Sequence, residues 1–86
     1  MDINQLSKIV KKKILENEMI ENVELEDKTF LHKKHKTNVS NKFHIIIKIK
    51  SERLKSMSRI ESNKFIYRLL NEEMKNYIHS LQILFY

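Results

Sequence analysis

Apolar side chains recur at spacings of three and four residues in two stretches of the chain, which is the pattern of amphipathic helices. The first stretch covers residues 3–16 and follows Asp2, whose carboxylate is placed to cap the first helical turn. The second begins at Ser58, which forms a capping-box sequence with Glu61, and is predicted to end near Lys75. The apolar positions are Ile3, Leu6, Ile9, Val10 and Ile14 in the first helix and Ile66, Leu69, Leu70, Met74 and Tyr77 in the second.

Three further stretches have the residue pattern of β-strands. Residues 23–27 alternate apolar with acidic side chains, and residues 43–50 include three consecutive isoleucines, which favours a central strand. Residues 78–86 are predicted to form the last strand. The apolar sides of the strands are Val23 and Leu25 in the first, Phe43, Ile45, Ile47 and Ile49 in the second, and Leu81, Ile83 and Phe85 in the third.

A long basic, histidine-containing loop is predicted between the first two strands. Residues 28–41 have no periodicity and are rich in polar and basic side chains. A loop of this length in a small domain usually has a function. With a short segment at residues 51–57, the order is helix, strand, long loop, strand, short segment, helix, strand. This order predicts a single α+β domain over residues 1–86, with a three-stranded sheet covered by helices on one face.

The composition limits the chemistry that this domain can carry out. Eighty-six residues are enough for one small core. The absence of cysteine excludes disulfides, a thiolate nucleophile, zinc sites of the Cys type and an iron–sulfur cluster held by the chain's own thiolates. The absence of glycine makes the phosphate-binding loops of P-loop and dinucleotide-binding enzymes improbable.

The net charge of +6 is concentrated in the middle of the chain. Residues 28–59 carry ten Lys and Arg side chains and one acidic side chain, whereas residues 1–27 are net acidic. Such a region suits contacts with nucleic-acid phosphates, but the lysine content is also that of an AT-rich genome, so a solvated basic face is the alternative. The candidate nucleic-acid contacts are Lys33, Lys34, Lys48, Lys50, Arg53 and Arg59.

Nothing in the sequence predicts contact with a membrane. The longest apolar run, residues 45–47, is too short to span a bilayer. The first residues have the pattern of neither a secretory signal nor a transit peptide. We therefore expect the protein to act in the cytoplasm.

The four histidines are the side chains that titrate nearest to neutral pH and that bind metals most readily. His32 and His35 are spaced i,i+3 in the loop, where they either face one metal ion or are simply exposed. His44 is predicted to lie on the surface beside Lys48, without a function. His79, between the second helix and the last strand, either hydrogen-bonds to the backbone or acts as a ligand.

The acidic side chains form no catalytic constellation. Glu72 and Glu73 are predicted to be neighbours on an exposed helix face, and Glu24 and Glu26 line a strand. No acidic pair is accompanied by a nucleophile, so we expect a protein that is not an enzyme.

The C-terminal half carries the most specific motif. Residues 66–74 (IYRLLNEEM) form a helical segment with an acidic pair, and the sequence Ile78-His79-Ser80-Leu81 follows. Upstream are an acidic strand ending in Asp27, a loop with histidines, and an aromatic residue followed by a β-branched strand. From residue 23 to residue 85 this sequence resembles the BolA family, whose signature is a capped helix, an acidic pair and a Val/Ile-His-Ala-Leu segment.

The resemblance to BolA proteins implies a class II KH-like fold with the order helix, strand, strand, helix, short helical turn, strand. Its three-stranded mixed sheet is expected to pack on the helices. It also implies a partner of a monothiol glutaredoxin that shares with it a glutathione-containing [2Fe–2S] cluster. The implied function is iron–sulfur cluster trafficking or assembly, or iron regulation in a stress response, rather than catalysis. By this resemblance His79 is one iron ligand, and the pattern Asp27-x-Thr29-x-x-His32 makes His32 the second, with His35 in reserve.

The chain departs from the family pattern at three places. It has no glycine near Ser56, it has Ser62-Asn63-Lys64 where an Arg-His-Arg-like stretch is usual, and it has Lys42 where a histidine often precedes the aromatic residue. These departures weaken the transfer of DNA contacts more than they weaken the fold. The position of His79 is unaffected.

Nucleic-acid binding remains the alternative function. Some BolA proteins are described as transcription factors, so the basic residues 28–59 are compatible with a transcriptional regulator that binds DNA. The absence of glycine excludes the Gly-x-x-Gly clamp with which true KH domains hold single strands. The apo form is expected to be a monomer or a weak dimer.

Overall fold

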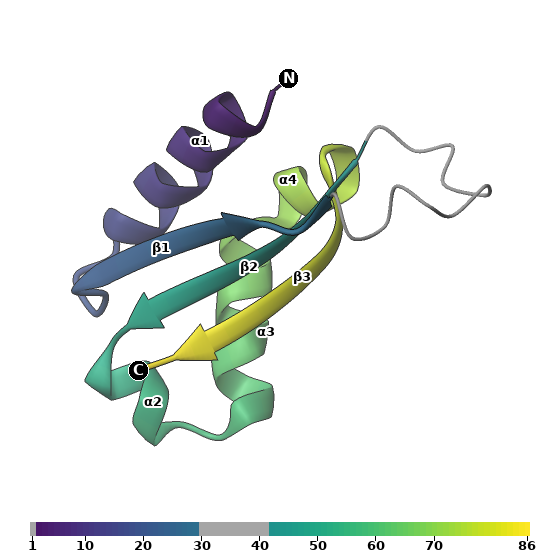
Figure 1. The fold of residues 1–86 in the computed structure, drawn as a ribbon. Helices are drawn as coiled ribbons and strands as arrows, with labels where there is room; N and C mark the ends of the chain where they lie inside the picture. The colour runs from purple at the N-terminus through teal and green to yellow at the C-terminus, as the bar shows by residue number, and fades with distance from the viewer. Residues whose placement is uncertain (1, 30–41) are drawn as a thin grey trace.

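The computed structural model describes residues 2–29 and 42–86. Its three strands form one sheet in the order β1-β2-β3, in which β2 is antiparallel to β1 and parallel to β3 (Figure 1). The predicted α+β class and mixed sheet are confirmed. The elements are α1 (Ile3–Leu15), β1 (Asn22–Asp27), β2 (Phe43–Lys50), α2 (Glu52–Ser56), α3 (Arg59–Leu69), α4 (Asn71–Asn76) and β3 (Ile78–Phe85).

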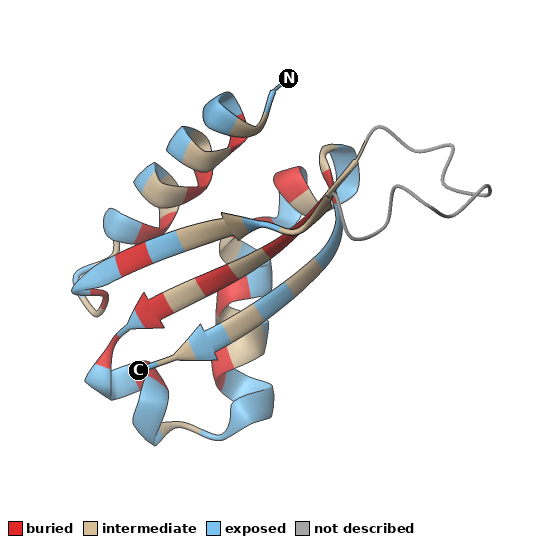
Figure 2. Ribbon diagram, in the orientation of Figure 1, coloured by how far each residue is buried: buried red, intermediate tan, exposed pale blue. Residues whose placement is uncertain are grey.

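The hydrophobic core lies between the sheet and helices α1 and α3, which cover the same face (Figures 1 and 2). Strand β2 is central, as its isoleucines predict, and it directs Ile45, Ile47 and Ile49 into the core. The alternate side chains of β2 lie on the other face, because successive residues of a strand point to opposite sides. None of the described helices is long and apolar enough to cross a membrane.

Helix α1 forms as its periodicity predicts. Leu6, Val10 and Ile14 are fully buried along one face. Asp2 caps the first turn by accepting a hydrogen bond from the backbone N–H of Gln5 at 2.8 Å, and the Gln5 side chain accepts one from the backbone N–H of Asp2. The capping box fixes the start of the helix, because each side chain of the pair accepts a hydrogen bond from the backbone N–H of the other residue.

The second predicted helix is interrupted. Ser58 caps its start as predicted, with its hydroxyl accepting from the backbone N–H of Glu61 at 3.2 Å. However, α3 ends at Leu69, Leu70 leaves the helical conformation (φ −105°, ψ 22°), and a separate short helix, α4, follows. Leu70 is fully buried, so the break places an apolar side chain in the core and changes the direction of the chain before β3.

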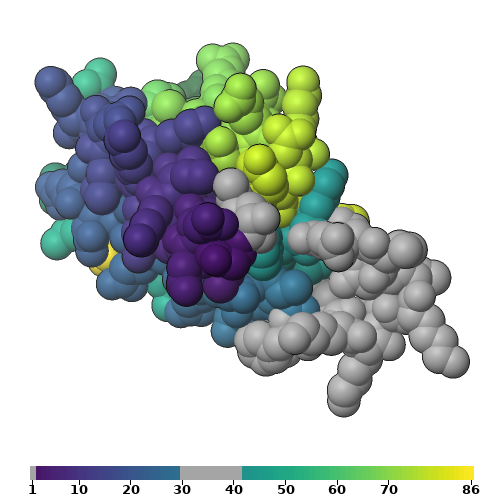
Figure 3. Space-filling model, turned by 90° about the horizontal axis from the view of Figure 1, so that it is seen from above, coloured from purple at the N-terminus to yellow at the C-terminus, as the bar shows by residue number. Residues whose placement is uncertain are grey.

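This break also makes the prediction of an exposed Glu73 wrong. Glu73 is only 4% exposed, whereas its neighbour Glu72 lies on the surface. Both carboxylate oxygens of Glu73 accept hydrogen bonds from Nζ of Lys13, at 2.9 and 2.8 Å, and the hydrogen bond to Glu73 raises the pKa of Lys13. Figure 3 shows the N-terminal helix beside the yellow-green segment that contains α4. The ion pair therefore links α1 to α4, the short helix that leads into β3.

Candidate functional site

The candidate site lies at the end of the sheet where β1 stops and β2 and β3 begin (Figure 1). The backbone N–H of Phe43 donates to the carbonyl of Tyr77 at 2.8 Å, and the N–H of Lys28 donates to the carbonyl of His44 at 2.7 Å. The register between β2 and β3 shifts at Phe43 and His44. These contacts bring the ends of all three strands together around His44.

His79, the residue of the C-terminal motif, is exposed at the start of β3. Its ring lies beside the ring of His44, with 4.8 Å between the ring centroids and 53° between the planes. The strand holds the backbone of His79 in place, and the residue remains exposed. A solvent-accessible imidazole on a rigid strand is a suitable ligand for a metal ion or cluster.

The prediction that His44 is a surface residue is wrong. It lies on the face of β2 opposite the core isoleucines, as expected, but it is only 6% exposed. Its Nδ1 atom is 2.7 Å from Oγ of Ser80, with which it shares a hydrogen bond, and its backbone N–H donates to Oγ1 of Thr29 at 3.1 Å. His44 is enclosed because it begins a central strand and is flanked by the residues after β1 on one side and by His79 and Ser80 on the other.

A side-chain turn directs the chain as it leaves β1. Oδ1 of Asp27 accepts hydrogen bonds from the backbone N–H of Thr29, at 2.9 Å, and from its hydroxyl group. The same hydroxyl accepts from the backbone of His44, so the turn is tied to β2. Asp27 and Thr29 are the first two residues of the predicted ligand pattern, and the structure gives both of them a structural role.

The other predicted loop residues lie outside the described part of the chain, and they are His32, Lys33, Lys34 and His35. Among residues 2–29 and 42–86, no three His, Cys, Asp or Glu side chains are grouped in a way that would hold a metal ion. A hollow of about 250 Å³ adjoins the histidine pair on the outer face of the sheet, and its walls include Lys28, His44, Ser80 and Gln82.

Four of the predicted nucleic-acid contacts lie among the described residues, namely Lys48, Lys50, Arg53 and Arg59. Nζ of Lys48 is 2.9 Å from Oε1 of Glu26 across the sheet, and this hydrogen bond lowers the pKa of Glu26 and raises the pKa of Lys48. Lys50, Arg53 and Arg59 are exposed and are in no ion pair with a described residue. The charge of Lys48 is therefore balanced, whereas the other three remain available to anions.

Comparison with known proteins gives a consistent assignment. A family model described as BolA-like protein matches residues 14–86. The structure is similar to the BolA domain of SufE1 from Arabidopsis thaliana, with a TM-score of 0.78 and 23% identity over 98% of this chain and 93% of that one. It is similar to BolA1 from Arabidopsis thaliana, with a TM-score of 0.73 and 22% identity over 92% of this chain and 87% of that one.

A third similar structure is BolA1 from Mus musculus, with a TM-score of 0.72 and 20% identity over 92% of this chain and 62% of that one. No curated protein sequence matches the chain. The structural similarities show the same fold, and the family model covers most of the sequence, including all three strands. The chain therefore belongs to the family of BolA-like proteins.

Proposed function

We propose that this protein is a non-catalytic partner of a monothiol glutaredoxin and shares with it a glutathione-containing [2Fe–2S] cluster. The observation that carries the proposal is the exposed His79, which stands beside His44 at the start of β3 in a chain of the BolA-like family. The cluster would be transferred to recipient proteins or would report on iron supply, in the cytoplasm.

The donor set of the chain fits a shared cluster. The sequence contains no cysteine, so this chain can offer iron only imidazole or carboxylate ligands. We propose His79 as one ligand and His32 as the second, with His35 in reserve, and the thiolates come from the glutaredoxin and from glutathione. Imidazole binds metals only in its neutral form, so protonation releases it more readily than a low-pKa thiolate, which suits a cluster that is passed on.

The described residues support a second ligand from the loop. Thr29 is the last described residue before residues 30–41, and its hydroxyl oxygen accepts a hydrogen bond from the backbone N–H of His44. His32 is three residues further on, and three residues span at most about 11 Å. His44 itself acts as a positioning residue: its Nδ1 is held by Ser80, so its ring forms a fixed wall against which His79 packs.

The proposal is tested by reconstituting the complex and recording its spectrum. The protein is mixed with a monothiol glutaredoxin, glutathione, iron and sulfide, and visible absorption and circular dichroism are measured. We expect the spectrum to differ from that of the glutaredoxin homodimer, and we expect His79→Ala to abolish the difference. Leu84→Ala is the matched control, because Leu84 is also exposed on β3 but does not line the hollow beside the histidine pair.

The two loop histidines are separated by the same assay. His32→Ala is expected to shift the spectrum of the mixed complex, whereas His35→Ala is expected to leave it unchanged. If His79→Ala gives the wild-type spectrum, the ligand assignment is wrong. If the wild-type protein leaves the glutaredoxin spectrum unchanged and gives no NMR shifts on titration with the apo glutaredoxin, the partnership itself is wrong.

Nucleic-acid binding is the second candidate, and one observation favours it. Lys50, Arg53 and Arg59 are exposed without an ion pair to a described residue. Phosphate contacts would make binding fall steeply with salt concentration. Neutralising Lys50 and Arg53 should weaken binding, whereas neutralising Lys48, which Glu26 already balances, should have a smaller effect. No affinity for duplex DNA at low salt would exclude this candidate.

A further inference from the structure

Strand β3 is an edge strand whose own residues lack the usual protection against pairing. Its sequence, IHSLQILF, contains no Asp, Glu, Lys, Arg or Pro. Among the described residues it pairs only with β2, so its other edge faces outward. Natural proteins normally protect such an edge with charges, prolines or a covering element, because unpaired N–H and C=O groups invite another strand.

The hydrogen bonds show which backbone groups face outward. The N–H of Tyr86 donates to the carbonyl of Ile49 in β2, so even-numbered residues of this strand are paired with β2. The carbonyl of Leu81 instead accepts from Oη of Tyr67 in α3 at 3.1 Å, on the side away from β2. Because residues of a strand alternate, Ile83 and Phe85 also direct their N–H and C=O groups outward.

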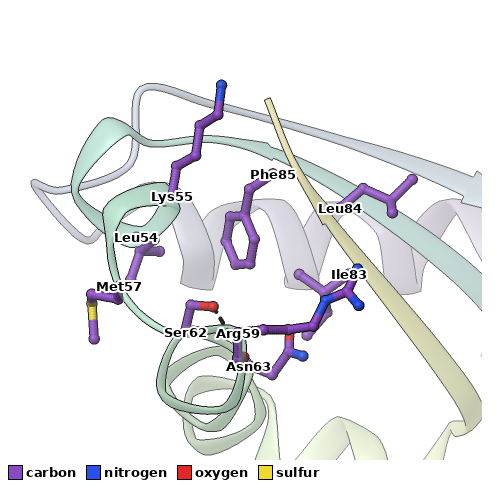
Figure 4. Close-up of a pocket in the computed structure, with 9 residues that line it drawn as sticks. All are labelled: Leu54, Lys55, Met57, Arg59, Ser62, Asn63, Ile83, Leu84 and Phe85. Carbon is purple, nitrogen blue, oxygen red and sulfur yellow. Dashed lines mark hydrogen bonds between the residues drawn. The ribbon is translucent and has the colours of Figure 1, made fainter.

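A groove runs between this edge and α3. One hollow of about 240 Å³ lies where Phe85 and Ile83 face α2 and the start of α3, and Figure 4 shows the two side chains pointing into it while Leu84 points away. A second hollow of about 320 Å³ continues along α3 toward Tyr67 and shares Arg59 and Asn63 with the first. The groove therefore contains the apolar side chains of Ile83 and Phe85 in its first hollow, is more polar along α3, and lies directly against the outward-facing backbone groups.

The side chains around the groove make its charge positive. Lys55, Arg59, Lys64 and Arg68 line it or the hollow that adjoins Tyr67, and no acidic side chain is among the described residues that line these hollows. None of the four cations forms an ion pair within the described part of the chain. Oδ1 of Asn63, in the groove wall, is buried without a hydrogen-bond partner there.

We propose that the edge of β3 binds an extended, acidic peptide segment of a partner protein by strand addition. The peptide backbone pairs with Ile83 and Phe85, alternate apolar side chains enter the groove, and carboxylates face the cations of α2 and α3. The hydrogen bond from Tyr67 to Leu81 closes the edge at one end, so the added strand is short. This surface is on a different part of β3 from His79.

The observations favour a peptide over the other occupants. A nucleic acid would need a backbone clamp and several stacking platforms. The chain has no glycine, and among the described residues that line the groove Tyr67 is the one exposed aromatic side chain. A second copy of β3 would bring its own cations against these four, because a two-fold edge pairing places like surfaces together. An acidic strand satisfies both the backbone and the charge.

The first test uses the peptide acetyl-(Glu-Val)4-amide, titrated into the ¹⁵N-labelled full chain and followed by NMR. We expect shifts of the amides of residues 81–85 and of α3. Ile83→Pro removes one outward N–H but keeps the pairing with β2, and should weaken binding about fivefold. Ile83→Val keeps the N–H and should bind as the wild type does.

A second pair of variants tests the charge. Arg59→Gln with Lys64→Gln should weaken binding by about three- to tenfold at low salt. Lys8→Gln with Lys12→Gln removes the same charge from the exposed face of α1 and should leave binding unchanged. If Ile83→Pro does not fold, a peptide that is N-methylated at alternate residues replaces it, and it should bind the wild type at least fivefold more weakly.

Three results would overturn the proposal. The first is equal weakening by both charge-neutralised pairs, which would mean non-specific attraction. The second is tighter binding of an oligothymidylate than of the peptide to the same residues, which would make the groove a nucleic-acid site. The third is a concentration-dependent dimer in sedimentation that Ile83→Pro dissolves, which would make the occupant a second copy. Each of these measurements is independent of the cluster spectrum. Failure of the strand-addition proposal therefore leaves the proposal on His79 intact.

Discussion

The two edge strands of the sheet differ in the charge of their side chains. Strand β1 contains Glu24, Glu26 and Asp27, whereas β3 contains no acidic, lysine or arginine residue. On the β1 side, the Glu26 carboxylate is within 4 Å of both Lys48 and Lys28. On the β3 side, the charged side chains that line the groove are cations of α2 and α3, which form no ion pair with a described residue.

The difference shows that one edge of a small sheet can oppose pairing with another chain while the other edge permits it. Charged side chains on an edge strand oppose pairing with another chain, and β1 has them in three of its six positions. Strand β3 directs Ile83 and Phe85 toward a groove, and the uncharged side chains of Ser80, Gln82 and Leu84 lie on the other face. Both candidate interactions of the molecule, the imidazole of His79 and the groove beside α3, are therefore on β3.

The largest expected effect comes from the residue that connects the two edges. Ile47 is fully buried in β2 and is in register with Leu25 in β1 and Ile83 in β3. Ile47→Ala leaves a cavity between the sheet and the helices and should cost about 2–5 kcal/mol of unfolding free energy. Urea unfolding followed by tryptophan-free probes, namely far-UV circular dichroism and NMR amide signals, measures the loss.

The same experiment tests whether the edges form one cooperative unit. The amide signals of β1 and β3 should disappear at the same urea concentration in the wild type and in Ile47→Ala. Separate midpoints for the two strands would show that each edge is stabilised independently. In that case the row of Leu25, Ile47 and Ile83 across the sheet would not couple the two edge strands.

Local patterns were sufficient to predict most elements but not the contacts between them. Helix α1 and all three strands follow from periodicity, because each buries one face of a single segment. The buried carboxylate of Glu73 is paired with Lys13, sixty positions away, and the break at Leu70 places its side chain in a core built from several elements. No local pattern contains that information.

The same reason explains which part of the site was predicted. The sequence indicates His79 as a candidate ligand because it belongs to the C-terminal motif, and the structure shows it as an exposed residue within β3. The enclosure of His44 depends on the register shift between β2 and β3, which brings Ser80 opposite it. The signal that would have indicated this is a histidine at the start of a strand predicted to be central, since such a residue has a neighbour on both sides.

A smaller loss is expected from the ion pair that fastens the β1 side of the molecule to the β3 side. Lys13 is in α1, which packs against β1, and Glu73 is in α4, which leads into β3. Lys13→Met leaves the buried carboxylate without its donor and should cost about 1–3 kcal/mol, measured by urea unfolding. Lys12→Met, on the exposed face of the same helix, is the control and should change stability little.

The pH dependence of this pair has a definite sign. The pKa of Lys13 is raised above its usual 10.5, so its contribution is complete below pH 10.5 and is lost as pH rises through the folded-state pKa. Wild type should therefore lose stability above pH 10.5 more steeply than Lys13→Met. Parallel curves for the two proteins would mean that the charge of Lys13 does not stabilise the fold.

The smallest effect should come from the charged edge itself. The hydrogen bond from Lys48 lowers the pKa of Glu26 below its usual 4.5. Its stabilising contribution is therefore present above pH 4.5 and is lost as pH falls through the folded-state pKa. Glu26→Gln removes this contribution and should flatten the decline of the urea midpoint below pH 4.5. The midpoint at neutral pH should change little, because exposed ion pairs contribute weakly.

Glu24→Gln is the control, since Glu24 is on the same face of β1 without a described ion pair. If Glu24→Gln flattens the acid limb as much as Glu26→Gln does, the β1 edge is stabilised by its overall charge and not by the contact with Lys48, and its difference from β3 is one of composition alone.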